Sequence, residues 1–327
     1  MIKYVFKRIL LMIPILFGVA FIVFFIMDLT PSDPGSIILG MGAPQEAIDQ
    51  LNHELGYDRP FFTRFFSYMG DLVFHFDMGT SYRSNLPVLE EVTSKLPVTI
   101  LIAFWSMVIA TIIGVPLGVL SAVKQYSVAD NVATTTALIL AALPTFWLGM
   151  MLMTWFSLKL GWFPSSGIGS WKHYVLPTVG LGIPYAAQQL RFTRSSMLET
   201  IRADYIRTAR AKGAASRSVI WGHAMKNALL PVITITGMNF GGLIGGAVGT
   251  EVLFSLPGLG NLLVTSIRQK DIPVVMGTTI VLAAIFSLIM LVVDVMYAMI
   301  DPRLKSKYMS KRVAKVKSQI KKEGANA

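Results

Sequence analysis

Few side chains in this sequence have the types and spacing that chemistry requires. The four histidines, His53, His75, His173 and His223, are scattered, and no two have the i, i+4 spacing of a helical zinc site. Cysteine is absent, which excludes disulfides and thiolate metal sites. The patterns HExxH, GxSxG and the P-loop GxxxxGKS or GxxxxGKT are also missing. We therefore predict no catalytic residue, no metal site and no cofactor bound by this chain.

The most informative segment is basic and rich in small residues, ADYIRTARAKGAASRSVIWGHAMKNALLPVI at 203–233. Asp204 suits a helix start and Gly213 suits a helix end, so we predict a short helix over 203–213. Its small residues, Ala209 and Gly213, are four apart and would let another backbone approach closely. Four basic side chains could meet acidic groups around it: Arg202, Arg207, Arg210 and Lys212. We predict a helix that fits a groove on a protein partner, and the alternative is a solvated basic loop on anionic lipid.

The composition defines the environment in which this segment must work. The chain has 327 residues, of which 54% are apolar and 14% charged, and its mean hydropathy is +0.60. Average soluble domains are about 45–50% apolar and 25% charged, so this is an integral membrane protein. The net charge of +11 comes largely from bases at 191–217 and 303–322, beside apolar stretches. This placement favours the cytoplasmic membrane surface and anionic lipid over nucleic acid.

Six stretches free of Asp, Glu, Lys and Arg are long enough to be candidate membrane spans: 9–27, 96–123, 131–158, 174–190, 227–250 and 272–293. The fourth is short and contains Pro177 and Pro184, so we expect it to be kinked or tilted, with Arg191 and Arg194 snorkelling at its end. We also expect kinks at Pro144 in the third span and at Pro116 in the second. The resulting fold is an all-α, multi-pass membrane protein with six transmembrane helices.

The loops predict the orientation. Lys3, Lys7 and Arg8 precede the first span, so we expect a cytoplasmic N-terminus, and six crossings return the Lys-rich C-terminus to the same side. The segment at 203–233 is then cytoplasmic as well. The chain divides into an N-terminal helix (1–29), an external segment (30–95), a core membrane domain (96–300) with a cytoplasmic loop at about 200–226, and a basic tail (301–327).

The external segment has nine acidic and four basic residues and a helical pattern. Pro44 suits a helix start, Ile48, Leu51 and Leu55 share one face, and Gly56 suits a C-cap. The aromatic stretch that follows, RPFFTRFFSYMGDLVFHFDMG, is typical of a helix in the outer interface. Two alternatives stay open, a folded external subdomain and a loop that covers its own bundle.

Several motifs together resemble one family. TARAKG (208–213) followed by HAMKNALLPVIT (223–234) resembles the cytoplasmic loop of ABC importer permeases, in the branch that serves dipeptides, oligopeptides and nickel. GTEVLFSLPGLGNLL (249–263), the step at 270–273, MIDPRLK (299–305) and the first apolar helix resemble the same branch. The resemblance covers nearly the whole chain. The Glu-Ala-Ala of the general importer loop is replaced here by Arg207, Thr208 and Ala209.

The resemblance implies a type I importer fold in the inner membrane of a prokaryote. This chain would pair with a second, similar permease, two ATP-binding subunits that use ATP and Mg²⁺, and an external substrate-binding protein. It would not be an enzyme itself. The substrate would be a dipeptide or an oligopeptide, with a nickel chelate or glutathione as alternatives. The residues expected to couple it to an ATPase are Arg207, Thr208, Ala209, Arg210, Lys212, Gly213 and Pro231.

Glu251 and the preceding glycines are candidates for the transport pathway. Intramembrane carboxylates are costly unless paired or wetted, so Glu251 could gate an external mouth and meet a peptide amino terminus. The alternative is a structural hydrogen bond within the bundle. Gly242 and Gly245 belong to a run of glycines three and four residues apart, which suits either a pore-lining helix or static close packing.

A stand-alone secondary transporter or channel is the alternative from another class. It would show intramembrane charges for ion coupling and broken helices at matching places in two halves. The six spans are nearly free of charge and the halves are not alike. A membrane-embedded enzyme would need a nucleophile and base or metal ligands at membrane depth, and the sequence has no such motif.

Overall fold

A computed structural model of the chain describes residues 2–29, 33–40 and 42–300. The predicted basic tail lies outside these residues. Within them the secondary structure is helical, apart from one isolated bridge between Thr80 and Pro87. The α-helices are α1 (Ile2–Leu29), α2 (Pro34–Leu39), α3 (Gln45–Glu54), α4 (Phe61–Gly70), α5 (Val88–Val123), α6 (Val128–Ala142), α7 (Thr145–Leu152), α8 (Lys172–Ile201), α9 (Asp204–Ala211), α10 (Ser216–Ser218), α11 (Met225–Leu253), α12 (Leu259–Gln269) and α13 (Ile272–Ile300). Three π-helical segments join them: η1 (Asp71–His75), η2 (Met153–Lys159) and η3 (Val219–Ala224).

Among the described residues, four helical stretches are long and apolar enough to cross a membrane: Val5–Leu29, Val88–Val123, Ser216–Leu253 and Ile272–Met296. A fifth arises if α6 and the α7–η2 helix, which meet at an angle of 101°, count as one broken span. Pro144 lies at this break, so the predicted kink there is confirmed. By contrast, Pro116 lies within the uninterrupted helix α5.

Helix α8 contains the fourth predicted span but does not reach the same apolar composition. It continues through Pro177 and Pro184 for 30 residues and packs against α5, α6, α7 and α11. Its buried positions include glycines and the polar Gln189 and Thr193. Because α8 is covered by other helices instead of lipid along much of its length, it tolerates polar residues that a lipid-facing span would not.

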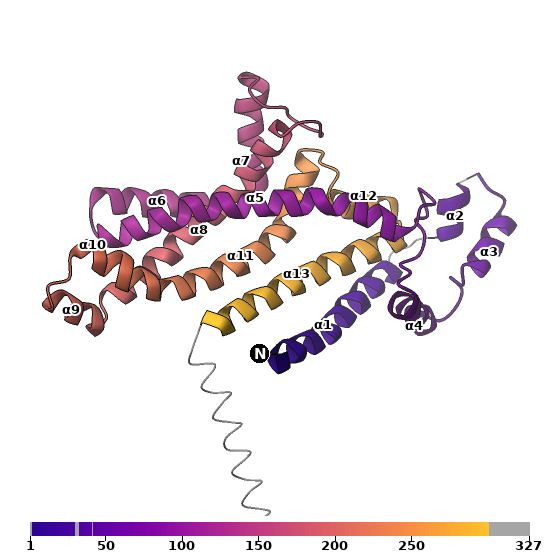
Figure 1. Ribbon diagram of the computed structural model, residues 1–327. Coiled ribbons are helices and arrows are strands. Elements are labelled where there is room, and N and C mark those ends of the chain that lie inside the picture. Colours follow the sequence, from indigo (N-terminus) through magenta and orange to yellow (C-terminus); the bar gives the residue numbers. More distant parts are fainter. Residues whose placement is uncertain (1, 30–32, 41, 301–327) are drawn as a thin grey trace, which may run out of the picture.

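Close backbone packing joins α5 to α8, the most extensively packed pair of helices (Figure 1). A Cβ atom at Gly114 would lie 2.6 Å from the Ala186 carbonyl oxygen, and one at Gly118 would lie 2.6 Å from the Leu190 carbonyl oxygen. Only glycine fits at these positions. The pair forms a GxxxG motif, which sequence analysis overlooked although its spacing is visible in the sequence.

The segment between α1 and α5 packs on the bundle. Helix α3 confirms the predicted helix after Pro44, with Ile48 buried and Gly56 at a φ of 68° just beyond its end. Helix α4 places the fully buried ring of Phe65 against phenylalanines of α1, while Phe62 and Phe66 stay exposed.

Polar contacts hold α1 and α13 in place at both of their ends. Arg64 of α4 bonds Asp28 of α1 at 2.5 Å, and Ser81 bonds Asp271 before α13 at 2.5 Å. At the other end, Arg8 of α1 and Asp294 of α13 form an ion pair at 2.7 Å. Helices α1 and α13 therefore lie side by side and antiparallel, with the start of α1 and the end of α13 at one end (Figure 1).

Candidate functional site

The short helix predicted in the basic segment is α9, and it lies at one end of the bundle (Figure 1). Asp204 occupies its first turn, where the helix dipole favours an acid. Gly213 follows with a φ of 81°, a left-handed conformation that ends the helix and that other residues adopt only with strain. The helix is two residues shorter than predicted at its C-terminal end, because Lys212 already has a non-helical conformation.

One buried side chain seats α9 on the bundle. Ile206 has no exposed surface, and it packs in a cluster with residues from the ends of α5 and α8, from η3 and from α11. The buried members are Val119, Ala122, Met197, Ile206, Val219, Ala224 and Ala228. Helix α9 therefore packs on η3 and is joined through this cluster to the ends of three long helices.

The opposite face of α9 is open to solvent. Arg207, Thr208, Arg210, Lys212 and Gly213 are exposed, and no atom lies within 4 Å of a Cβ built at Gly213. Arg207 makes only a loose pair with Asp204 at 3.8 Å, on the surface. Ala209, expected on the open small-residue face with Gly213, is instead half-buried.

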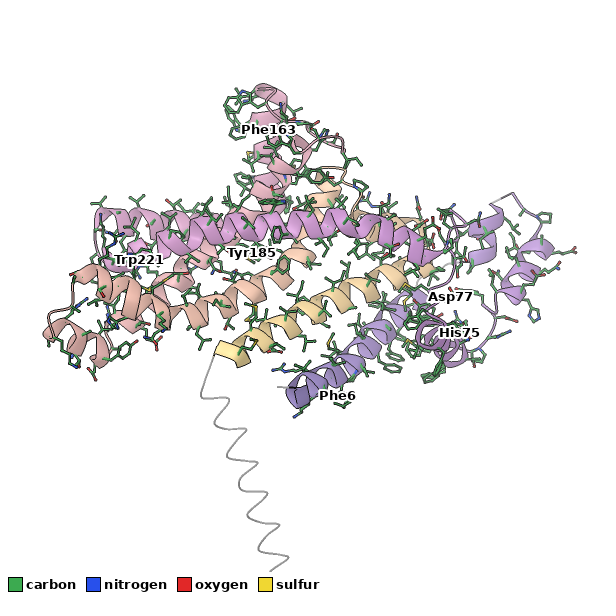
Figure 2. The ribbon with its side chains drawn as sticks, in the orientation of Figure 1. Phe6, His75, Asp77, Phe163, Tyr185 and Trp221 are labelled. Carbon is green, nitrogen blue, oxygen red and sulfur yellow. The ribbon has the colours of Figure 1, made fainter. Side chains whose placement is uncertain are left out.

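Two exposed aromatic side chains lie at the same end of the bundle, and they were not predicted from the sequence. Tyr205 is 48% exposed and Trp221 is 57% exposed, and Figure 2 labels Trp221 at the end of the bundle that carries α9. Aromatic residues inside a charged segment were the available signal, because such side chains are enriched at protein interfaces. The surface thus combines cationic and aromatic groups on a firmly seated support.

Pro231, expected within the coupling loop, lies in α11. The helical stretch Ser216–Leu253 runs from α10 through η3 into α11, so it begins within the predicted loop of about 200–226, and only residues 212–215 separate it from α9. Apolar periodicity could not reveal this early start, because the first turns carry Arg217, His223 and Lys226.

A buried ion pair braces the same end of the bundle. Asp130, whose side chain is 1% exposed, accepts hydrogen bonds from Arg194 Nε at 2.7 Å and Nη2 at 2.8 Å. The Ser121 hydroxyl and the Tyr126 amide also donate to this carboxylate. Arg194, predicted to snorkel at the end of its span, is thus paired with a carboxylate of α6 at this end of the bundle.

Glu251 is completely enclosed by its own chain. Its carboxylate accepts hydrogen bonds from Thr99 Oγ1 at 2.6 Å, from the Gly260 amide at 2.7 Å and from the Asn261 amide at 3.1 Å. Gly258 is packed so tightly that a Cβ would lie 2.2 Å from the Glu251 Cδ. The side chain thus caps the N-terminus of α12, which supports the structural alternative over a gate.

The glycines of α11 divide into a packed and an open set. Gly237 and Gly241 face Val293 and Phe286 of α13, where an added Cβ would collide. Gly242 lies beside the Tyr185 hydroxyl of α8, 3.1 Å from where its Cβ would be. No atom lies within 4 Å of a Cβ built at Gly245. Close packing and an open face therefore coexist on the same helix.

Within the described residues, no group of three or more His, Asp or Glu side chains is arranged to hold a metal ion. The candidate site is a contact surface on α9, whose buried Ile206 joins it to the bundle.

Comparison with known proteins identifies the family. Residues 114–306 match the family described as "Binding-protein-dependent transport system inner membrane component", and residues 1–103 match its N-terminal model. The glutathione transport system permease protein GsiC of Escherichia coli strain K12 is 40% identical over 307 residues, which cover 94% of this chain and all of GsiC. GsiC of Salmonella choleraesuis is 41% identical over the same coverage.

Solved structures agree at the level of the fold. An inward-facing structure of the MetNI methionine ABC transporter has a TM-score of 0.54 at 21% identity, and the match covers 65% of this chain and 97% of that one. A crystal structure of an amino acid ABC transporter with histidines has a TM-score of 0.51 at 15% identity, covering 66% and 95%. The chain therefore belongs to the family of inner membrane components of binding-protein-dependent transport systems, and it is the permease component of an ABC importer.

Proposed function

We propose that this permease imports short peptides, glutathione among them, and that α9 is the helix through which an ATPase subunit drives it. In the full transporter it pairs with a second, similar permease, two ATPases and an external binding protein. Both termini and α9 lie on the cytoplasmic side. The observation that carries the proposal is the seating of α9 by Ile206 on the ends of α5, α8 and α11.

The chemistry of the α9 surface supports an acidic or polar cleft as its partner. Exposed bases attract acidic groups, and exposed aromatic rings such as Tyr205 and Trp221 supply apolar contact area at an interface. The seating supplies the second requirement of a coupling element, because a docked helix that moved independently of the bundle would transmit no work. Lipid binding alone requires the charge but not the rigid seat.

The absence of cysteine from this chain allows a direct test of the contact. Thr208→Cys places a single thiol on the exposed face of α9, and Thr265→Cys places a matched thiol on the exposed face of α12. Each variant is assembled into the complete transporter and labelled with a maleimide photo-crosslinker. We expect Thr208→Cys, and not Thr265→Cys, to link to the ATPase subunit. A link from Thr265→Cys alone would contradict both the contact and the orientation.

A bulky substitution at Gly213, such as Gly213→Trp, would be a less specific test than this pair of variants. The φ of 81° at Gly213 means that tryptophan there strains the backbone as well as adding bulk, so lost uptake would have two causes. Thr208 has an ordinary helical conformation, and its hydroxyl bonds only the Asp204 carbonyl of its own helix.

The substrate class is tested in proteoliposomes that contain the assembled transporter and its binding protein. We expect ATP-dependent uptake of a labelled dipeptide or of glutathione, as the similarity to GsiC suggests. Uptake of a nickel chelate alone would replace the peptide proposal within the same branch. Uptake by this chain alone, driven by an ion gradient without ATP, would overturn the proposal altogether.

A further inference from the structure

A cavity of about 500 Å³ opens beside the break between α6 and α7. Its size is within the range of about 300–1,000 Å³ that is usual for small-molecule sites. Ala141, Leu143 and Thr145 line it from the break, Pro184, Tyr185, Gln188 and Arg191 from α8, and Met238, Asn239 and Gly242 from α11. Figure 2 labels Tyr185 near the middle of the bundle. The cavity is therefore formed by three elements far apart in the sequence, and polar and apolar groups line it in similar amounts.

An exposed polar stripe continues from this cavity along α8. Gln188, Arg191, Ser195 and Glu199 are all exposed and are three or four residues apart, so they share one face of the helix. The stripe spans about 16 Å towards the end of α8 that carries α9. Polar side chains in a bundle of membrane helices face a water-filled path or another protein, not lipid. The stripe therefore marks a side of α8 that faces water or another protein.

Arg191 is the only charged side chain among those that line the cavity. Within the described part of the chain it forms no ion pair, whereas Arg194 one turn later is committed to Asp130. The polar groups behind the cavity are also engaged, since Gln189 donates to Thr236 at 2.7 Å and accepts from Asn239 at 3.3 Å. The guanidinium is thus a charge without a counterion in a preformed polar pocket.

We propose that Arg191 binds the carboxylate of the transported substrate in this cavity, as a transient site on its way through the permease. The inference rests on the proposed peptide substrate and extends it. A guanidinium matches a carboxylate with two parallel hydrogen bonds, and the hydroxyl and amide groups of Tyr185 and Gln188 suit the peptide groups nearby. Because Leu143 and Thr145 flank the break in the helix, movement of α7 against α6 changes the shape of the site.

The first test measures uptake of glutathione by the complete transporter with saturating loaded binding protein. We expect Arg191→Gln to lower the maximal rate about 10- to 100-fold, the range for loss of a hydrogen bond to a charged group, and Arg191→Lys to lower it less. Arg268→Gln removes an exposed charge from α12, outside the cavity, and we expect it to leave uptake unchanged. Undiminished uptake in Arg191→Gln would overturn the proposal.

The second test probes the charge of the cavity without any substrate. Met238→Cys places a lone thiol on the cavity wall. Two thiosulfonate reagents that modify thiols are compared there, an anionic one that carries a sulfonate group and a cationic one that carries a trimethylammonium group. We expect the ratio of anionic to cationic reaction rates to fall about tenfold when Arg191→Gln is added. Gln188→Glu, at an exposed position one turn earlier, should lower the ratio with Arg191 still present. This variant replaces Arg191→Gln in the test if Arg191→Gln does not assemble. A ratio that neither change alters would refute the site.

The two tests separate the possible failures. If wild-type transporter takes up no peptide while the reagent ratio depends on Arg191, the peptide proposal fails and the anion site stands. If peptide uptake is normal in every variant and the ratio is constant, the anion site fails and the peptide proposal stands.

Discussion

Ile206→Ala is the substitution that most directly tests how α9 is held. Helix α9 has only eight residues, and Ile206 is its one buried side chain. An isolated helix of this length is unstable in water, so the contact of Ile206 with the ends of α5, α8 and α11 stabilises it. Alanine keeps the helix propensity high and removes the contact, so the change acts on the seating itself.

The magnitude follows from the burial. Truncation of a fully buried isoleucine to alanine costs about 2–5 kcal/mol. If this loss of stability affects only the local opening of α9, the equilibrium constant for that opening rises about 30-fold to several thousand-fold. Ile206→Val is the graded control, with an expected cost of about 0.5–1.5 kcal/mol. Tyr205→Ala is the positional control, because this neighbouring side chain is half exposed and outside the buried cluster.

Hydrogen exchange provides the assay, measured on the permease pair without its ATPase subunits. We expect amides in the second half of α9 to exchange faster in Ile206→Ala by that factor, with α5 and α8 little changed. In the complete transporter, peptide uptake per ATP hydrolysed should fall, because a loosened helix moves without the bundle. Equal exchange in Ile206→Ala and wild type would refute the argument that this side chain seats α9.

Three further changes have distinct expected outcomes. Arg194→Gln leaves a buried carboxylate without its cation and should destabilise the permease by about 3 kcal/mol, seen as a lower melting temperature in detergent; an unchanged value would contradict the bracing role. Glu251→Ala leaves two amides and the Thr99 hydroxyl without their acceptor, so we expect it to lower the stability of the permease by about 3 kcal/mol or more. Glu251→Gln retains an acceptor and should lower the stability less. Equal losses of stability in the two variants would contradict the capping role. Gly242→Leu should lower both the melting temperature and uptake by pressing on a tyrosine hydroxyl, while Gly245→Leu should lower uptake alone because its side is open; wild-type uptake in both would refute a role for this face.

Features with local sequence signals were predictable. The start and end of α9 follow from Asp204 and Gly213, and those of α3 follow from Pro44 and Gly56, because caps act within one turn. The break at Pro144 was predictable for the same reason. The family motifs then placed these elements in an importer permease.

Features that join distant residues were not predictable. Asp130 and Arg194 are 64 positions apart, and nothing local indicates that one neutralises the other. Counting charge-free stretches placed the span at 174–190 in α8, but its low apolar content could not be explained from the sequence, because the helices that cover α8 are distant in the chain. Gly114 and Gly118 had a visible spacing, but the sequence does not say which helix approaches them.

The enclosure of Glu251 has a consequence for how the chain is made. Two of the three donors to its carboxylate, Gly260 and Asn261, come 9 and 10 residues later in the chain. During synthesis α11 therefore emerges with an acid whose cap has not yet been translated. We therefore expect α11 and the start of α12 to fold together, because the Glu251 carboxylate gains two of its three hydrogen bonds only when α12 has formed.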